Sequence, residues 1–222
     1  MSMSWWKRIW GGAAEQVETS DAVWSKAQAG EFEFHRTNQW RQTDDFMANT
    51  VKIFKLFGLE PDSYAGRTVM DVGAGSRLRN LYFEQATLVA LEPLADRFRR
   101  EISWCDLDRA HAVISAPAEQ LAEAWVGKVD LVISINVLDH CYSFQQILGN
   151  IFAYLKPGGL ALLSFDSHET TDHMHPLVLT EPVCREHFRR AGFRVDRVLT
   201  GLEPYGRSYG HGDTLTFWAY KP

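Results

Sequence analysis

The stretch at residues 68–76 constrains the fold of this chain more than any other. It begins with TVMDV, an apolar run that is prone to form a β-strand and carries one acid, and it continues into the tight turn GAGS. Glycines in such a turn allow unusual backbone torsions and let a ligand approach the main chain closely. Residues 88–92 read LVALE, which is a second buried strand that ends in a carboxylate. The sequence therefore predicts two strands of an α/β sheet, with a ligand-binding turn after the first.

The turn and the second acid together suit a nucleotide-like cofactor, because the turn would lie under the middle of the ligand and Glu92 would bind its ribose hydroxyls. A dinucleotide site also needs a third glycine where the next helix begins, so that a pyrophosphate can bind there. That glycine is absent from GAGSRL at residues 73–78. Asp71, before the first glycine, would repel phosphate but suits a cationic ligand. S-Adenosylmethionine meets both conditions, since it carries an amino group and a sulfonium and has no phosphate.

Two further segments carry a resemblance to a known family. Residues 129–140 read VDLVISINVLDH, and residues 155–164 read LKPGGLALLS. With the turn and the second acid, they resemble the motifs of class I S-adenosylmethionine-dependent methyltransferases in the right order and at the right spacing, over residues 64 to 200. One position departs from the family. Many members have a glycine where this chain has Arg77, which weakens the expected contact of the turn with the methionine tail.

Beyond the turn, the chain alternates between strand-like and helix-like segments. Such alternation predicts a parallel sheet with helices on both faces and right-handed crossovers. The resemblance implies an α/β, Rossmann-like sheet of seven strands that is mostly parallel, with the last strand antiparallel and inserted. The predicted strands are residues 68–72, 87–91, 111–115, 129–135, 159–165, 192–199 and 214–220. The predicted helices are residues 77–84, 94–102, 118–125, 143–155 and 181–191.

Residues 1–63 are predicted to form a helical extension in front of a cofactor-binding methyltransferase domain at residues 64–222. A helix is expected over residues 44–57, where apolar side chains form one stripe. The segment at residues 30–41 mixes aromatic side chains with His, Arg and Asn. It is either an amphipathic cover for the sheet edge or a lid that borders the substrate. A contact within a homodimer is a further alternative.

The composition narrows the class of partner and the compartment. The chain of 222 residues has a formal net charge of -5, which argues against a general nucleic-acid binder. Three cysteines without a CxxC motif fit a reducing cytoplasm. No apolar run approaches the ~20 residues of a membrane span. The clustered tryptophans in residues 1–10 are expected to pack on the domain's own surface, with a membrane interface or a partner as the alternative. We expect a cytoplasmic protein without stable membrane insertion.

Ligands of open α/β sheets bind at the carboxyl ends of the strands, and this rule gathers the candidate cofactor-binding residues. By resemblance, Asp71 and the glycine turn hold the methionine portion, Glu92 accepts both ribose hydroxyls, and residues 116–119 border the adenine. Each of the three acids keeps an alternative role, as a loop-stabilising acceptor (Asp71), a helix cap (Glu92) or a solvated acid (Glu119). The expected cofactor-binding residues are Asp71, Gly73, Ala74, Gly75, Glu92, Pro93, Ala116, Ala118, Glu119, Asn136 and Val137.

Methyl transfer is an in-line displacement, so the enzyme mainly holds the nucleophile and the sulfonium in line. A hydroxyl nucleophile also needs a base. His140 is the first candidate, because it follows the fourth strand where the methyl group should point; the alternative is a histidine that only packs in the loop. Asp139 is expected to orient that imidazole, to bind substrate or to cap the next helix. In the loop after the fifth strand, His173 and His175 are expected to line the substrate pocket.

The loop that carries these two histidines, DSHETTDHMHP at residues 166–176, is close to a zincin motif but fails it. Asp172 stands where the second zinc ligand would be, and Met174 and Pro176 favour a loop over a helix. A metal site made by these groups is an open alternative, but substrate contacts are favoured and no metal is predicted. The glycine-rich segment at residues 204–213 is either a flexible connection between the last strands or a flap over the substrate.

These features predict an S-adenosylmethionine-dependent methyltransferase that acts on a small polar metabolite, such as a sugar or an acidic natural product. Oxygen is favoured over nitrogen as the acceptor atom. The sequence NVLD at residues 136–139 differs from the Asn/Asp-Pro-Pro-Tyr motif of enzymes that methylate nucleobase or glutamine amino groups, so no nucleic-acid partner is expected. The alternatives are a non-catalytic cofactor-binding regulatory protein, a nucleic-acid methyltransferase and a nicotinamide-dependent oxidoreductase.

Overall fold

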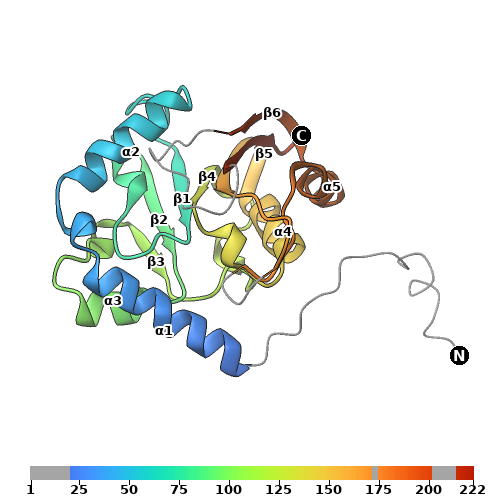
Figure 1. Ribbon diagram of the computed structural model, residues 1–222. Coiled ribbons are helices and arrows are strands. Elements are labelled where there is room, and N and C mark those ends of the chain that lie inside the picture. Colours follow the sequence, from blue (N-terminus) through green and yellow to red (C-terminus); the bar gives the residue numbers. More distant parts are fainter. Residues whose placement is uncertain (1–20, 172–174, 202–213) are drawn as a thin grey trace, which may run out of the picture.

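One mixed sheet of seven strands organises the part of the chain that the computed structural model describes, residues 21–171, 175–201 and 214–222 (Figure 1). The strand order is β3-β2-β1-β4-β5-β7-β6. β1 to β5 pair in parallel, whereas β7 is antiparallel to both β5 and β6. The predicted Rossmann-like fold, with its inserted antiparallel last strand, is confirmed. The strands are β1 (Thr68–Val72), β2 (Thr87–Leu91), β3 (Ala112–Ile114), β4 (Val129–Ile135), β5 (Leu155–Asp166), β6 (Arg194–Thr200) and β7 (Thr214–Tyr220).

Helices cover both faces of this sheet. The α-helices are α1 (Asp21–Thr37), α2 (Asp45–Leu56), α3 (Ala95–Glu101), α4 (Phe144–Tyr154) and α5 (Glu181–Ala191). The short 3-10 helices are η2 (Gln39–Gln42), η3 (Arg79–Tyr82), η4 (Leu107–Arg109), η5 (Glu123–Trp125) and η6 (Leu138–His140). The predicted helices at residues 44–57, 94–102, 143–155 and 181–191 are confirmed by α2 to α5, with no end displaced by more than one residue.

The predicted helix at residues 77–84 is wrong, because only η3 forms there. Two carboxylates accept the backbone N–H groups at the start of this segment. The N–H of Leu78 donates to Asp106 Oδ1 at 2.7 Å, and that of Arg79 donates to Asp71 Oδ2 at 3.2 Å. Leu78 is therefore held in an extended conformation, which delays and shortens the helix.

The predicted helix at residues 118–125 is also wrong, because only η5 forms there. Side chains of α4 take the backbone carbonyl groups that such a helix would use. The Nδ2 group of Asn150 donates to the carbonyl oxygens of Ala118 and Glu119, each at 2.9 Å. These tertiary bonds hold the segment as an irregular loop at the end of β3, where it borders the site described below.

The alternation of side chains along β1 divides the core into two layers. Met70 and Val72 pack into the apolar cluster of α4 and α5, whereas Val69 packs into the cluster of α2. Figure 1 shows α4 and α5 on one side of the sheet and α2 on the other. Since successive side chains point to opposite faces of a strand, Asp71 points to the face of α2, where its carboxylate meets Arg79.

Residues 21–63 share their core with the sheet. α2 completely buries Phe46, Ile53 and Phe54. Next to it in the chain, α1 lies beside α3 (Figure 1), and Phe32 stacks on Phe98 with ring centroids 6.0 Å apart. The division of the chain at residue 63 stays a prediction.

Residues 1–20, 172–174 and 202–213 lie outside the described part of the chain. The predictions for the tryptophan cluster, for His173 and for the glycine-rich segment fall there. Of the helices that are described, none has both the length and the apolar composition of a membrane span.

Candidate active site

A cavity opens at the carboxyl ends of β1, β2 and β4, where ligands of open α/β sheets bind. It encloses about 940 Å³ when the space at its open mouth is included. Among the described residues, Asp71, Ala116, Asp139 and His175 are predicted site residues that do not line this cavity. Those that line it are Gly73, Ala74, Gly75, Glu92, Pro93, Ala118, Glu119, Asn136, Val137 and His140.

The glycine turn after β1 forms one wall of the cavity. Gly73 and Gly75 have φ angles of +73° and +65°, in the left-handed region that favours glycine. A β-carbon on Gly73 would overlap the side chain of Val137, and one on Gly75 would overlap the imidazole of His35. Both positions therefore require glycine for torsion and for space.

The chain leaves β4 through a residue with an unusual torsion. Asn136 has a φ of +59°, which asparagine tolerates better than most residues. Its N–H donates to the carbonyl oxygen of Ser164 at 2.8 Å, so the turn is tied to β5. This turn carries Val137 onto Gly73 and brings His140, two positions after Leu138, to the edge of the cavity.

Glu92 follows β2 and lies in the cavity wall with 6% of its surface exposed. Its Oε2 accepts the N–H of Gly75 and its Oε1 accepts that of Leu94, both at 2.9 Å. Burial raises the pKa of Glu92 to about 7, against the lowering effect of these two hydrogen bonds. An ionised carboxylate has about four acceptor positions. Glu92 can therefore cap the chain at Leu94 and still accept hydrogen bonds from ligand hydroxyls.

Asp71 lies beneath the turn and outside the cavity wall. It is 2% exposed and accepts the N–H of Arg79 at 3.2 Å. Burial raises the pKa of Asp71 to about 7, and the charge of Arg79 opposes that rise. This geometry matches the loop-stabilising role considered for Asp71, since it ties β1 to the segment that follows the turn.

Arg77, which stands where many family members have glycine, is directed away from the cavity. Its Nε donates to Asp106 Oδ2 at 2.8 Å, and its Nη1 donates to the carbonyl oxygen of Arg41 at 2.6 Å. The ion pair is mostly buried, with side-chain exposures of 13% and 11%. The side chain thus ties the turn to η2 and does not line the cavity.

Two arginines line the cavity near the turn: Arg41, which belongs to the segment considered as a lid, and Arg79, which the sequence reasoning missed. Arg79 donates from Nη1 to Thr50 Oγ1 at 3.0 Å, and its guanidinium lies 4.6 Å from the ring centre of Phe46. Arg41 lies 5.5 Å from the same ring. Together they make this end of the cavity cationic. For Arg41, the mixture of arginine and aromatic residues at positions 30–41 was the signal in the sequence.

One face of α1 covers the cavity. Trp24, Gln28, Glu31 and His35 line it, at the spacing of successive helical turns. Trp24 also packs edge-on against Tyr142, with ring centroids 5.2 Å apart, so α1 is joined to the chain after η6. The sequence reasoning considered either a sheet-edge cover or a lid at residues 30–41 and missed the earlier half of this face. The i, i+4, i+7, i+11 spacing of these four residues was the sequence signal that they share one face of a helix.

His35 is the closest contact between α1 and the glycine turn. The N–H of Ser76 donates to His35 Nδ1 at 3.2 Å, and the Ser76 hydroxyl lies 2.7 Å from the same nitrogen. Burial lowers the pKa of His35 to about 2, and the charges of Arg41 and Arg79 lower it further. The imidazole is therefore neutral, with its acceptor nitrogen on Ser76.

The end of the cavity near β3 is formed by Pro117, Ala118 and Glu119. Glu119 is 6% exposed and accepts the N–H of Tyr142 at 3.3 Å. Burial raises the pKa of Glu119, and the hydrogen bonds that it accepts oppose that rise. The solvated role considered for Glu119 is wrong, because its carboxylate is buried and tied to the chain after η6.

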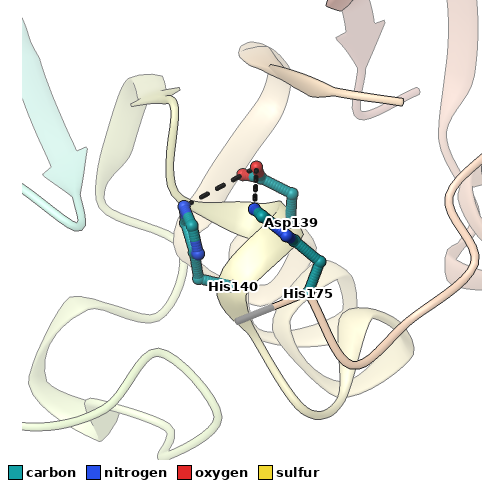
Figure 2. A group of neighbouring side chains, drawn as sticks. All are labelled: Asp139, His140 and His175. Carbon is teal, nitrogen blue, oxygen red and sulfur yellow. Dashed lines mark ion pairs between the residues drawn. The ribbon is translucent and has the colours of Figure 1, made fainter. Parts of the chain in front are cut away.

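A cluster of one acid and three imidazoles adjoins the cavity, and we call Asp139, His140, His168 and His175 the histidine cluster (Figure 2 shows all but His168). Asp139 Oδ2 lies 3.5 Å from His168 Nε2, 3.7 Å from His140 Nε2 and 3.8 Å from His175 Nε2. The rings of His168 and His175 stack with centroids 4.0 Å apart. Only His140 lines the cavity itself. His168 was not among the predicted site residues, although it lies in the loop whose histidines were noted.

A second carboxylate, at the end of β5, adds to the negative charge beside this cluster. Asp166 is 3% exposed and accepts the hydroxyl of Thr214 at 3.0 Å. Burial raises the pKa of Asp166, and the nearby charge of Asp139 raises it further. Two buried acids therefore share one region of low dielectric with three histidines.

Comparison with known proteins agrees with this arrangement. The family described as "Methyltransferase domain" matches residues 39–175. Curated protein sequences yielded no match. Among solved structures, Burkholderia thailandensis 1,6-didemethyltoxoflavin-N1-methyltransferase, with bound 1,6-didemethyltoxoflavin and S-adenosylhomocysteine, is 17% identical with a TM-score of 0.61. The match covers 94% of this chain and 93% of that chain.

Two further structures share the fold at similar levels. A methyltransferase from Aquifex aeolicus that depends on S-adenosylmethionine is 18% identical with a TM-score of 0.61, over 87% of this chain and 98% of that chain. A Haloferax volcanii protein solved in complex with the methyltransferase activator Trm112 is 18% identical with a TM-score of 0.61, over 92% and 99%. The match of the methyltransferase domain to more than half of the sequence, together with the seven-stranded fold, shows that the chain belongs to the family of class I S-adenosylmethionine-dependent methyltransferases.

Proposed function

We propose that this enzyme transfers the methyl group of S-adenosylmethionine to an oxygen of a small polar acceptor. The observation that carries the proposal is a single cavity with the glycine turn and Glu92 on one side and His140 on the other. One cavity can thus hold the cofactor against the turn and present its methyl group toward the histidine cluster.

The charges of the cavity suit the parts of this cofactor. Glu92 would accept the ribose hydroxyls, and the segment from Pro117 to Glu119 would border the adenine. Arg41 and Arg79 would bind the carboxylate of the methionine tail, because guanidinium groups pair well with carboxylates. Gln28 Oε1 is buried with no hydrogen-bond partner among the described residues, and it would accept an N–H of the cofactor.

The acceptor would bind between the methyl group and His140. Transfer needs the acceptor atom in line with the carbon–sulfur bond, and a hydroxyl acceptor must lose a proton. His140 Nε2 would take that proton, with Asp139 Oδ2 3.7 Å away to orient the imidazole and to stabilise its charged form. His175, whose ring centroid lies 4.8 Å from that of His140, would border the acceptor.

Nitrogen is the second candidate for the acceptor atom. The Burkholderia thailandensis structure is named as an N1-methyltransferase, and its fold covers most of this chain. A nitrogen acceptor with a free lone pair would need no base. The pH dependence of turnover would separate the two cases, because only the oxygen acceptor requires a base to be unprotonated.

The direct test is calorimetric titration with S-adenosylhomocysteine, with NADH as the control ligand. We expect S-adenosylhomocysteine to bind at one site per chain and NADH not to bind. A panel of small hydroxyl- and amino-containing acceptors then follows, with radiolabelled S-adenosylmethionine as the methyl donor. Tight binding of NADH alone would overturn the proposal. Binding of S-adenosylhomocysteine together with salt-dependent binding of RNA would move the acceptor from a small molecule to a nucleic acid.

A further inference from the structure

We propose that the histidine cluster is a binding site for one divalent transition-metal ion, with Asp139 Oδ2, His140 Nε2 and His175 Nε2 as its ligands. The sequence reasoning left a metal site open for this loop but favoured substrate contacts. Figure 2 shows the three side chains converging on one point from η6 and from the loop after β5. Their ligand atoms all lie within 4.8 Å of one another.

The separations of these atoms are close to those on a bound ion. Two ligand atoms ~2.1 Å from a tetrahedral metal are ~3.4 Å apart. Asp139 Oδ2 lies 3.7 Å from His140 Nε2 and 3.8 Å from His175 Nε2. A contraction of a few tenths of an ångström would bring these two pairs to the spacing found on a bound ion. The nitrogens of His140 and His175 lie within 4.8 Å of each other, so this third pair would have to approach further as the ion binds. At 3.7 and 3.8 Å, Asp139 forms ion pairs but no hydrogen bonds with His140 and His175.

The buried carboxylate needs a cationic partner. Asp139 is 1% exposed, and its Oδ1 has no hydrogen-bond partner among the described residues. A buried charge without compensation is unfavourable. Asp166 adds a second buried carboxylate beside the first, and the three imidazoles carry no charge in their neutral form. A divalent ion would balance the charge of these two carboxylates.

His168 contacts two of the three proposed ligands, Asp139 and His175. Its Nε2 lies 3.5 Å from Asp139 Oδ2, and its ring stacks on His175 at 4.0 Å between centroids with planes 25° apart. It is 5% exposed. This stacking fixes the orientation of the His175 ring, so His168 is a positioning residue of the proposed site.

The donor set selects the class of metal. Imidazole nitrogens favour zinc, iron, cobalt, nickel or copper, whereas magnesium and calcium favour oxygen ligands. Three protein ligands also leave at least one position open, as in catalytic zinc sites. Because His140 lines the cavity, that position is reachable from the space where the acceptor would bind.

The consequence for the reaction rests on the proposed function. A nitrogen that binds the ion cannot also accept a proton, so the ion would replace His140 as the activator of the acceptor. A metal ion lowers the pKa of a bound hydroxyl. The hydroxyl would release its proton to water, its oxygen would form the bond to the methyl carbon, and the electron pair of the broken carbon–sulfur bond would stay on sulfur. The favoured acceptors would then offer an oxygen that can bind the ion.

The test uses the untagged full chain, because a polyhistidine tag would bind the same ions. The protein is treated with a chelator, dialysed into metal-free buffer and titrated with Zn²⁺ by calorimetry and with Co²⁺ by visible absorption. The variants are Asp139→Asn and His175→Ala. The control is His111→Ala, which removes an exposed imidazole outside the cluster. S-Adenosylhomocysteine affinity is measured on every sample.

We expect one ion per chain in the wild type and in His111→Ala, and Mg²⁺ in excess should not displace it. Loss of a direct ligand should weaken Zn²⁺ binding by more than ~100-fold, beyond the effect of changing an outer-shell partner. Equal Zn²⁺ affinity in the wild type and in both cluster variants would overturn the site. If Asp139→Asn fails to fold, the test rests on His175→Ala, because the side chain of His175 is partly exposed and its loss leaves Asp139 in place. If the protein binds S-adenosylhomocysteine but not Zn²⁺, only the metal site is rejected. If it binds Zn²⁺ but not S-adenosylhomocysteine, only the proposed function is rejected.

Discussion

The proposed cofactor side of the cavity, with the glycine turn and Glu92, and the proposed acceptor side, with the histidine cluster, are held together in different ways. On the cofactor side, Glu92 accepts two backbone N–H groups at 2.9 Å, one of them from Gly75 of the turn. On the acceptor side, the contacts of Asp139 with three imidazoles measure 3.5 to 3.8 Å. The first side is closed by hydrogen bonds of the protein itself. On the second side, the Asp139 carboxylate and the three imidazoles lie at ion-pair distance, beyond the usual length of a hydrogen bond.

The largest expected effect tests whether the cofactor side depends on backbone shape. Gly73→Ala places a β-carbon against Val137, whereas Gly66→Ala, at nearly the same φ, meets nothing within 4 Å. Both variants carry the strain of a positive φ, on the order of 1 kcal/mol. Gly73→Ala should lose measurable S-adenosylhomocysteine binding in calorimetry, and Gly66→Ala should keep it. Similar affinities for the two variants would mean that torsion, and not the approach to Val137, limits this position.

The next effect tests the acceptor side by itself. His140→Ala should lower turnover by about 100-fold or more once an acceptor is known, since the residue is proposed either as the base or as a metal ligand. Cofactor affinity should change little, because Glu92 and the glycine turn remain intact. His187→Ala, which removes a half-buried imidazole bonded to Gln145, is the matched control. Parallel loss of cofactor affinity and turnover would show that the two sides are not separable.

Glu92→Gln tests the charge on the cofactor side. Removing a charged hydrogen-bond partner typically weakens binding by 1.5–3 kcal/mol, or about 10- to 150-fold. Because burial raises the pKa of Glu92 to about 7, wild-type affinity should rise between pH 6 and pH 8, as the ionised form that accepts ribose hydroxyls becomes populated. Glu92→Gln should flatten this profile, and Glu101→Gln, an exposed acid of α3, should not. A pH-independent wild type would remove Glu92 as the titrating ligand.

The same pKa has a consequence for the stability of the ligand-free protein. The folded protein holds the Glu92 proton more tightly than the unfolded chain, where the carboxyl titrates near its ordinary 4.5. Stability from this group is therefore full below pH 4.5 and is lost as the pH rises through about 7. The loss is on the order of 1–3 kcal/mol. Chemical denaturation at pH 5 and pH 8 should show it in the wild type and show less of it in Glu92→Gln.

The smallest expected effect tests how far α1 contributes to the cofactor side. His35→Ala removes the imidazole that packs on Gly75 and accepts the N–H of Ser76. One such contact is worth about 1 kcal/mol, so cofactor affinity should fall about 5-fold. Arg36→Ala, the exposed neighbour whose ion pair with Glu33 points to solvent, is the control. No change for His35→Ala would show that α1 only covers the cavity.

Much of the fold was predictable, because it follows from local patterns. The strands at residues 68–72, 87–91 and 129–135 and the helix at residues 181–191 have the predicted ends. Apolar periodicity and turn residues act over a few positions and need no partner. The helices expected at residues 77–84 and 118–125 failed for the opposite reason. Asn150, distant in sequence, bonds the carbonyl groups that the second helix would have used, and Asp106 and Asp71 bond the first N–H groups of the other segment, where Leu78 is extended.

The candidate site divides in the same way. The glycine turn and Glu92 were recognisable from the sequence, since each is defined by a short segment: two glycines after one strand, and an acid at the end of the next. The earlier half of the α1 face, with Trp24 and Gln28, and the guanidinium of Arg79 were missed. These side chains are placed at the cavity by contacts with residues that are distant in sequence. Trp24 packs against Tyr142, and Arg79 donates a hydrogen bond to Thr50.

The sequence by itself determined the sheet, the glycine turn and the class of cofactor, because backbone torsion, strand periodicity and the placement of one acid are properties of short segments. Only the tertiary structure determined which side chains line or adjoin the cavity. It brought His140 of η6 together with His168 and His175 of a distant loop around Asp139, and it placed Arg77 on Asp106 and away from the cavity. Such convergence depends on long-range packing, which sums many weak contacts and leaves no trace in the spacing of any single motif.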